Sequence, residues 1–251
     1  MRIAMISDSH GNLHALDAVL ADLDGAGPFD EVIFGGDIAF HGAFPAEVID
    51  RIRERGYRSV RGNTDEALVE MATDGAYTMS ITDDKQRHSA ALRVFDRWAL
   101  DRMTSDQVDF LAGLPLRIDI AGSDGARLTI AHATPFSAHV TVLPESSEES
   151  ARQVFANSDI DCFAYGHIHQ QYRREVDGRL LTSVGAIGAP LDGDWRAAYS
   201  ILTNNGNGWQ IEFRRVPYDI DAAVEALLAS SLPDREAIAT GMRMAGPKPK
   251  L

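Results

Sequence analysis

Seven side chains of the types that bind metal ions occur in five short groups along the 251-residue chain. They are Asp8, His10, Asp37, Asn63, His132, His167 and His169. Carboxylate oxygens and imidazole nitrogens are ligands that hard or borderline divalent ions bind in proteins. A single strand-end aspartate is typical of a turn, and a single histidine of a structural role. Five such groups at five predicted strand ends instead indicate one shared metal centre.

The first three groups follow short apolar segments that alternate with helical patterns. We expect strands at residues 2–6, 31–34 and 58–60, and helices at 12–23 and 46–55. This β-α-β-α-β order predicts parallel strands, whose carboxyl ends form the functional edge of an α/β sheet. Asp8, Asp37 and Asn63 follow those ends, so we expect them at that edge.

The rest of the chain reads as further strands and helices in a single domain over residues 1–251. Strands are expected at 116–120, 127–131, 162–165, 180–184, 197–202 and 210–215, and helices at 148–156 and 219–228. His132 follows one of these strands, and His167 and His169 follow another after Gly166. A mainly helical insert is expected at about 65–111 and a mobile tail from about 246.

Composition narrows the class of protein. The chain is 45% hydrophobic with a formal net charge of −13, so we expect an acidic globular protein that avoids general nucleic-acid binding and membranes. Its one cysteine, Cys162, lies in an apolar stretch and is interpreted as a core residue. The first seven residues are too few for a signal peptide, which makes a cytoplasmic location the expectation.

The five groups, in order, resemble the calcineurin-like metallophosphoesterases, whose pattern is D-x-H, G-D, G-N-x-D/E or G-N-H, a separate H, and G-H-x-H. Here they read Asp8-Ser9-His10, Gly36-Asp37, Gly62-Asn63-Thr64-Asp65, His132 and Gly166-His167-Ile168-His169. The tract at 188–199 is similar to the end of the small bacterial and archaeal phosphodiesterase branch. The resemblance covers nearly the whole chain. It implies an α/β fold, a four-layer α/β/β/α sandwich of two mixed sheets flanked by helices.

The resemblance also implies a dinuclear site. Asp8, His10, Asp37 and His169 would hold one divalent ion, and Asp37, Asn63, His132 and His167 the other, with Asp37 between them. Such a pair of ions clamps the attacking and leaving oxygens of an in-line displacement, and a hydroxide bridging them is the nucleophile. Asp37 and Asn63 are therefore expected to be catalytic. Mn²⁺ is the first expectation for the metal, with Fe, Co, Ni or Zn as alternatives.

Two departures from the family pattern affect catalysis and substrate contacts. Thr64 stands where many members carry a histidine that protonates the leaving group, and His41 is a candidate replacement or a plain surface residue. Residues 183–186 read Ser-Val-Gly-Ala where the related branch commonly has Asn-Pro-Gly-Ser. Two polar side chains are thereby lost or shortened.

Three further residues are candidate substrate contacts, each with an alternative role. Asn12 would touch the phosphate or cap the helix that follows. Arg61 would meet a phosphate oxygen or pair with a surface acid. Asp65 would orient a ligand or the substrate, or cap the next helix.

We therefore expect a metal-dependent phosphodiesterase acting on a small phosphate ester. The alternatives are a phosphomonoesterase, a dinucleoside polyphosphate hydrolase, or a non-catalytic metal-binding scaffold of the same fold. Retention of all seven ligand-type side chains argues against the scaffold. A homo-oligomer is a further possibility, and its contacts are expected in the helical insert.

Overall fold

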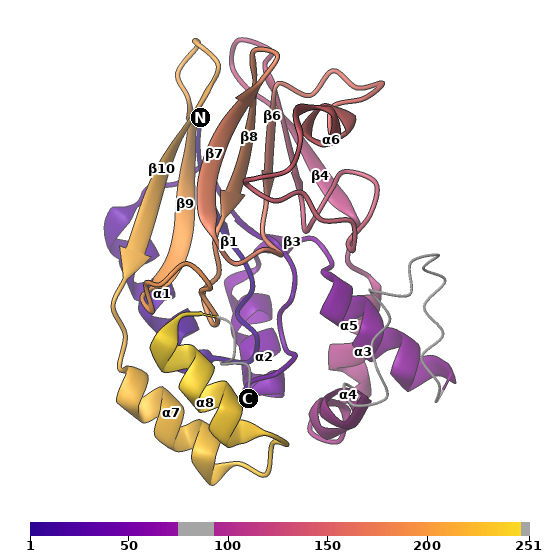
Figure 1. Cartoon of the computed structure of the whole chain (residues 1–251), viewed down its shortest axis with the longest axis vertical. Coiled ribbons are helices and arrows are strands. Elements are labelled where there is room, and N and C mark those ends of the chain that lie inside the picture. The colour runs from indigo at the N-terminus through magenta and orange to yellow at the C-terminus, as the bar shows by residue number, and fades with distance from the viewer. Residues whose placement is uncertain (75–92, 247–251) are drawn as a thin grey trace.

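Two five-stranded sheets pack face to face, with their strands in the upper half of the view in Figure 1 and most of the helices below them. The computed structural model describes residues 1–74 and 93–246. The first sheet has the order β10-β9-β1-β2-β3, and the second the order β4-β5-β6-β8-β7. Each sheet contains parallel and antiparallel pairs, so both are mixed, as the family resemblance implied.

The first sheet has three parallel strands at one side. Its strands are β1 (Arg2–Ile6), β2 (Glu31–Phe34), β3 (Arg58–Ser59), β9 (Ala197–Asn204) and β10 (Trp209–Val216). β1, β2 and β3 run parallel, while β9 is antiparallel to β1 and to β10. The carboxyl ends of the parallel strands therefore meet at one edge.

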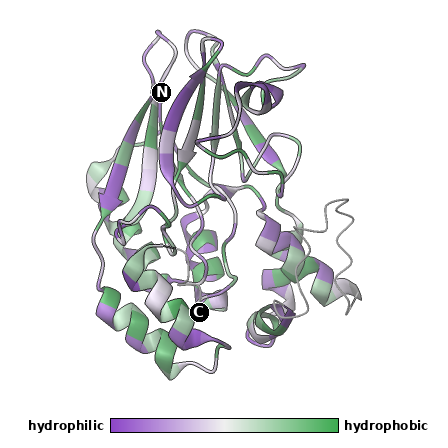
Figure 2. Ribbon diagram, in the orientation of Figure 1, coloured by the Kyte–Doolittle hydropathy of each residue, from purple (hydrophilic) through white to green (hydrophobic). Residues whose placement is uncertain are grey.

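The second sheet repeats this arrangement with a different chain order. Its strands are β4 (Arg117–Ala121), β5 (Arg127–Ala131), β6 (Cys162–Tyr165), β7 (Gln171–Val176) and β8 (Arg179–Val184). β5, β6 and β8 are parallel, and β4 and β7 are antiparallel edge strands. β7 was not among the expected strands, because its sequence, QYRREV, is mostly polar. Figure 2 shows that hydrophilic character.

Helices cover the outer face of each sheet. α1 (Leu13–Ala26) and α2 (Pro45–Arg55) share an apolar cluster with β1 and β2, whereas α6 (Glu148–Gln153) packs on the second sheet. α1 begins where the Asn12 side chain accepts a hydrogen bond from the Ala15 amide. α2 has a proline at its first position, and Gly56, with a left-handed φ of 64°, caps its C-terminus.

Three helices stand beside the sheets, and two more follow the last strand (Figure 1). The first set is α3 (Asn63–Asp74), α4 (Arg93–Leu100) and α5 (Ser105–Ala112); the second is α7 (Ile220–Ala229) and α8 (Arg235–Met244). The described parts of the predicted insert at 65–111 are thus mainly helical, with a short connection at 101–104 between α4 and α5. Its residues 75–92, and the end of the tail at 247–251, lie outside the described residues.

A shared apolar core joins the two sheets. Buried side chains of β1, β2, β5, β6 and β9 form one cluster between them, including Met5, Ile130 and Leu202. Separate clusters lie under α1 and α2 and under α6. These three layers of apolar contact confirm the four-layer sandwich. Within the described part of the chain, no helix has both the length and the apolar character needed to cross a membrane.

Candidate metal centre

All seven predicted ligand residues meet where the carboxyl ends of the parallel strands face each other. Asp8 and His10 follow β1, Asp37 follows β2, and Asn63 begins α3 just after β3. His132 follows β5, and His167 and His169 follow β6. The two edges are joined by the backbone, because Gly188 N–H donates to Asp8 O at 2.9 Å. The centre therefore lies between the sheets, and neither sheet forms it alone.

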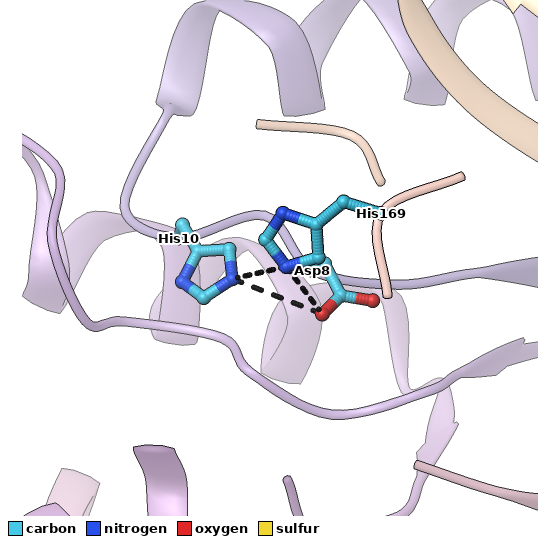
Figure 3. Close-up of side chains that lie close together, drawn as sticks. All are labelled: Asp8, His10 and His169. Carbon is cyan, nitrogen blue, oxygen red and sulfur yellow. Dashed lines mark hydrogen bonds and ion pairs between the residues drawn. The ribbon is translucent and has the colours of Figure 1, made fainter. Parts of the chain in front are cut away.

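Asp8, His10 and His169 form the first group of donors (Figure 3). The Nε2 atoms of His10 and His169 lie 3.0 Å apart, and His169 Nε2 lies 3.2 Å from Asp8 Oδ1. His10 Nε2 also lies 3.7 Å from Asp37 Oδ2. The Nε2 atoms of His10 and His169 and the carboxylates of Asp8 and Asp37 thus converge on one position.

Asn63, His132 and His167 form the second group with Asp37. His132 Nε2 lies 3.0 Å from Asn63 Oδ1, 3.2 Å from His167 Nδ1 and 3.4 Å from Asp37 Oδ1. His167 Nδ1 lies 3.0 Å from Asn63 Oδ1. Asp37 therefore presents one oxygen to each group, and Asp8 also lies within reach of Asp37 and His132.

These spacings fit divalent ions. Two donors each about 2.1 Å from a common ion lie roughly 3.0 Å apart at a right angle and about 3.4 Å apart at a tetrahedral angle. The donor separations within the two groups run from 3.0 to 3.7 Å. The Nε2 atoms of His10 and His169 converge at 3.0 Å, and a shared cation would accept a lone pair from each of them.

Backbone carbonyls fix which nitrogen of each imidazole faces the centre. The Nδ1 atoms of His10, His132 and His169 lie 3.1, 2.9 and 2.7 Å from the carbonyl oxygens of Phe40, Gly35 and Ala189. Because a carbonyl only accepts, each Nδ1 carries the proton and leaves the Nε2 lone pair free for a metal. His167 is reversed: Thr141 Oγ1 lies 2.9 Å from its Nε2, and its Nδ1 faces the centre.

The loops that carry the ligands adopt an uncommon backbone conformation. Asp8, His10, Asp37, His167 and His169 have φ values of 57°, 46°, 57°, 63° and 57°. A non-glycine residue with positive φ is disfavoured and persists only where the surrounding structure enforces it. Five of the seven candidate ligands share this feature, which sets the direction of their side chains.

Two glycines allow the loops to approach the aspartates closely. A Cβ atom at Gly62 would lie 2.0 Å from Asp37 Oδ1, and one at Gly166 would lie 2.2 Å from Asp8 Oδ2. Any side chain at either position would displace a carboxylate of the centre. This is the physical reason that glycine precedes the asparagine and histidine groups.

The buried charges of the centre shift one another's pKa values. Burial opposes ionisation of Asp8 and Asp37, but the nearby imidazoles outweigh it and hold the pKa of both carboxyls well below the usual range. Burial would lower the pKa of His132, yet Asp37 beside it raises it to about 10. Burial and the neighbouring His132 lower the pKa of His167 to about 3. The centre thus attracts positive charge, and a bound ion would replace the proton on His132.

Asp65 lies next to the centre, where its side chain accepts hydrogen bonds from backbone amides. Its side chain is fully buried, and its oxygens accept hydrogen bonds from the amides of Asp37, Ile38 and Gly62 at 2.9, 3.0 and 2.8 Å. Asp65 is at the third position of α3, so the bond from Gly62 satisfies a backbone amide at the start of the helix, and the bond from Asp37 holds the loop of a candidate ligand. Burial, with Asp37 adding to it, raises the pKa of Asp65 to about 6.

The other candidate residues lie around the centre with their own partners. Asn12 caps α1 and donates to Gly188 O at 3.2 Å, and Arg61 pairs with Glu66 at 2.7 Å. His41 stacks on Phe40 with ring centroids 5.0 Å apart. For Asn12 and Arg61, the structure shows the alternative role that each was assigned beside a phosphate contact.

Thr141 is a site residue that sequence reasoning missed. Its hydroxyl lies 2.9 Å from His167 Nε2 and donates to the His139 carbonyl at 3.4 Å. It lies in a loop after His132, with no motif around it, so no sequence pattern singles it out. Thr64, noted for replacing a histidine, is buried, and its backbone amide donates to Asp37 Oδ1 at 3.0 Å.

Comparisons with known proteins bear on the family and the fold of the chain. A family model described as a calcineurin-like phosphoesterase superfamily domain matches residues 1–206. The chain is 29% identical over 247 residues to an uncharacterized protein of Methanocaldococcus jannaschii, covering 92% of this chain and 94% of that protein. A metallophosphoesterase from Sphaerobacter thermophilus matches at a TM-score of 0.74 and 26% identity, over 98% of this chain and 100% of that one. A hypothetical protein from Pyrococcus horikoshii has the same fold, with a TM-score of 0.79 at 16% identity over 100% and 99% of the two chains.

Proposed function

Because the chain belongs to the calcineurin-like phosphoesterase superfamily, we propose that it is a metal-dependent phosphodiesterase with two adjacent divalent ions. Asp8, His10 and His169 would hold one ion, and Asn63, His132 and His167 the other. Asp37 would bind both. The observation that carries this proposal is the division of the donors into two groups that share Asp37, each with one Oδ atom of Asp37 within 3.7 Å of a histidine nitrogen.

The residues of the chain would hold the ions and leave the reaction to water. When bound, two divalent ions would supply Lewis acidity to the phosphoryl oxygens and make water nucleophilic at neutral pH. The only cysteine, Cys162, is buried in β6, where desolvation raises the pKa of its thiol. It is therefore no candidate for a covalent nucleophile.

The charges near the centre favour a diester over a monoester. A phosphomonoester is a dianion at neutral pH and gains most from arginine or lysine side chains around the phosphate. Arg61, the arginine expected nearest the site from sequence, is paired with Glu66. Glu66 also lies 2.7 Å from His139 Nε2, so this carboxylate engages both Arg61 and His139. A singly charged diester is the better match.

His41 is proposed as the donor of a proton to the leaving group in place of the histidine that Thr64 replaces. His41 and His10 line the same pocket beside the centre. Substitution His41→Asn should slow hydrolysis of alkyl esters, whose alkoxides need protonation, more than that of p-nitrophenyl esters. An equal effect on both leaving groups would contradict this role.

The test of the function is hydrolysis of bis-p-nitrophenyl phosphate by chelator-treated protein before and after addition of Mn²⁺. We expect turnover only with metal, and loss of at least about a thousandfold in kcat for Asp37→Ala. Fe²⁺, Co²⁺, Ni²⁺ and Zn²⁺ are tested in parallel, and Asp109→Ala, an exposed carboxylate on α5, is the control. Bound metal without turnover on any diester would instead support the non-catalytic scaffold.

A further inference from the structure

A pocket opens beside the first group of donors. His10 and His169 line both the metal centre and this pocket, so a molecule whose phosphate is bound at the centre has direct access to it. The rest of its wall comes from the start of α1, the loop before α2, the segment after β8, and the two C-terminal helices. The pocket is therefore continuous with the proposed site of reaction.

The C-terminal helices supply an apolar wall. Ala223 and Leu227 are four residues apart on α7, and Ile238 and Met242 are four apart on α8, so each pair lies on one helix face. The two helices pack against each other and α7 packs on α1, beside the lower ends of the strands (Figure 1). Phe44 completes the apolar lining and has its ring 5.6 Å from that of His14.

The polar side chains of the pocket lining are one asparagine and four histidines, Asn12, His10, His14, His41 and His169. Its lining contains no aspartate, glutamate, lysine or arginine among the described residues. The Asn12 amide is engaged with Ala15, Gly188 and Tyr218. His14 Nδ1 is buried and has no hydrogen-bond partner among the described residues. The wall formed by Phe44 and the C-terminal helices offers apolar side chains only. A neutral apolar group fits against that wall, and a charged group there would lose its hydration without compensation.

We propose that this pocket binds a neutral, apolar ester group of the phosphodiester substrate, with the phosphate against His10 and His169. The inference rests on the proposed function and adds the class of substrate to it. A phosphodiester has two ester groups, and the pocket selects for one of them by burial of apolar surface. Diesters with an aryl or similar apolar substituent are thus preferred over those with small or charged substituents.

The binding test uses two non-hydrolysable compounds with the same phosphonate head group, phenylphosphonate and methylphosphonate, titrated calorimetrically into Mn²⁺-loaded protein. We expect phenylphosphonate to bind at least about tenfold more tightly, which corresponds to about 1.4 kcal/mol. Ala223→Leu, which fills the pocket, should reduce the ratio to within about twofold and leave the affinity for methylphosphonate unchanged. The matched control Ala229→Leu adds the same side chain at an exposed position of α7 and should keep the ratio.

A second variant covers the case in which Ala223→Leu does not fold. Met242→Ala removes apolar surface from the pocket wall and should lower the phenylphosphonate affinity by about three- to tenfold, with methylphosphonate again unaffected. Equal affinity for the two phosphonates, or binding of neither, would overturn the proposal. So would a preference for phenylphosphonate that survives both pocket variants.

A kinetic measurement separates failure of this inference from failure of the proposed function. Ala223→Leu should raise KM for bis-p-nitrophenyl phosphate, with kcat changed less and the metal content unchanged. If turnover is the same in the pocket variants as in the wild type, the role of the pocket is contradicted and the diesterase function is retained. If the protein shows no turnover but still prefers phenylphosphonate, and Ala223→Leu removes that preference, the diesterase function is contradicted and the role of the pocket is retained.

Discussion

At the scale of single residues, the centre depends on side chains that would touch neither metal nor substrate. Asp65 ties the Asp37 loop to the Gly62 loop through three backbone amides. Thr141 and three backbone carbonyls orient the four imidazoles. Such supporting contacts set the direction of each donor atom, and their loss typically costs metal affinity without removing a ligand.

Asp65→Asn should weaken both the fold and the centre. Asparagine replaces one of the two accepting oxygens with an NH2 group, which only donates, so at least one buried backbone amide loses its partner. We expect a loss of about 1–3 kcal/mol in the free energy of unfolding, measured by urea denaturation. Metal content should fall as well. Asp109→Asn, on the exposed face of α5, is the control, and equal stability of the two variants would contradict the role given to Asp65.

Thr141→Val should lower metal affinity while leaving the fold intact. Valine has the shape of threonine but offers no oxygen to His167 Nε2, so the ring is free to turn its Nδ1 away from the centre. The expected loss is roughly 10–100-fold in the affinity of one of two Mn²⁺ sites, measured by metal titration. Thr141→Ser keeps the hydroxyl and should restore binding; a serine variant as weak as the valine variant would argue against the hydrogen bond.

At the scale of elements, two turns far from the centre hold the sheets together at their other end. Asp124, in the β4–β5 turn, accepts hydrogen bonds from the Gly208 amide at 2.7 Å and from Asn204 Nδ2 at 2.8 Å. These partners belong to β9 and to the β9–β10 turn. The hydrogen bonds, beginning with that from Gly208, lower the pKa of Asp124 to about 2.

The sign of this shift fixes a pH dependence of stability. A carboxyl whose pKa is lowered in the folded state stabilises the fold above its ordinary pKa near 4, and that contribution is lost as pH falls through about 2. Asp124→Ala should therefore be less stable than the wild type at pH 7, and the difference should shrink between pH 4 and pH 2. Urea denaturation across this range tests it, and a constant difference would exclude Asp124 as the source.

At the scale of the whole molecule, the metal centre lies between two sheets that each have their own apolar faces. The inter-sheet cluster and the two outer clusters do not involve the ligand side chains. Folding is therefore expected without metal, while ions would bind only when the edges of both sheets are in place. Metal binding and folding are linked by mass action.

Removal of metal should lower the melting temperature and leave the secondary structure unchanged. An ion present at a hundred times its Kd stabilises the native state by about 2.7 kcal/mol. We expect far-ultraviolet circular dichroism to be the same with and without Mn²⁺, and scanning calorimetry to show a higher Tm with it. His132→Ala should abolish most of that increase. Unfolding on chelation would show instead that the centre is required for the fold.

The sequence by itself determined the strand-end groups, most of the elements and the family. Hydrophobic periodicity and the glycines directly before Asp37, Asn63 and His167 are local features. The Asn12 and Asp219 caps likewise involve amides only three residues away. The seven ligand-type residues were therefore identifiable one after another, although their assignment to two ions remains a proposal.

Only the tertiary structure decided which residues surround the centre and what closes its pocket. The polar edge strand β7 and the short helix α8, which contains Gly241, carry weak local patterns and were not expected. Thr141 meets His167 across 26 residues, and Met242 reaches the pocket of His10 from the far end of the chain. Such contacts depend on how sheets and helices pack. The burial of apolar surface that drives this packing brings together elements far apart in the sequence, and the spacing of residues within one element does not indicate its partners.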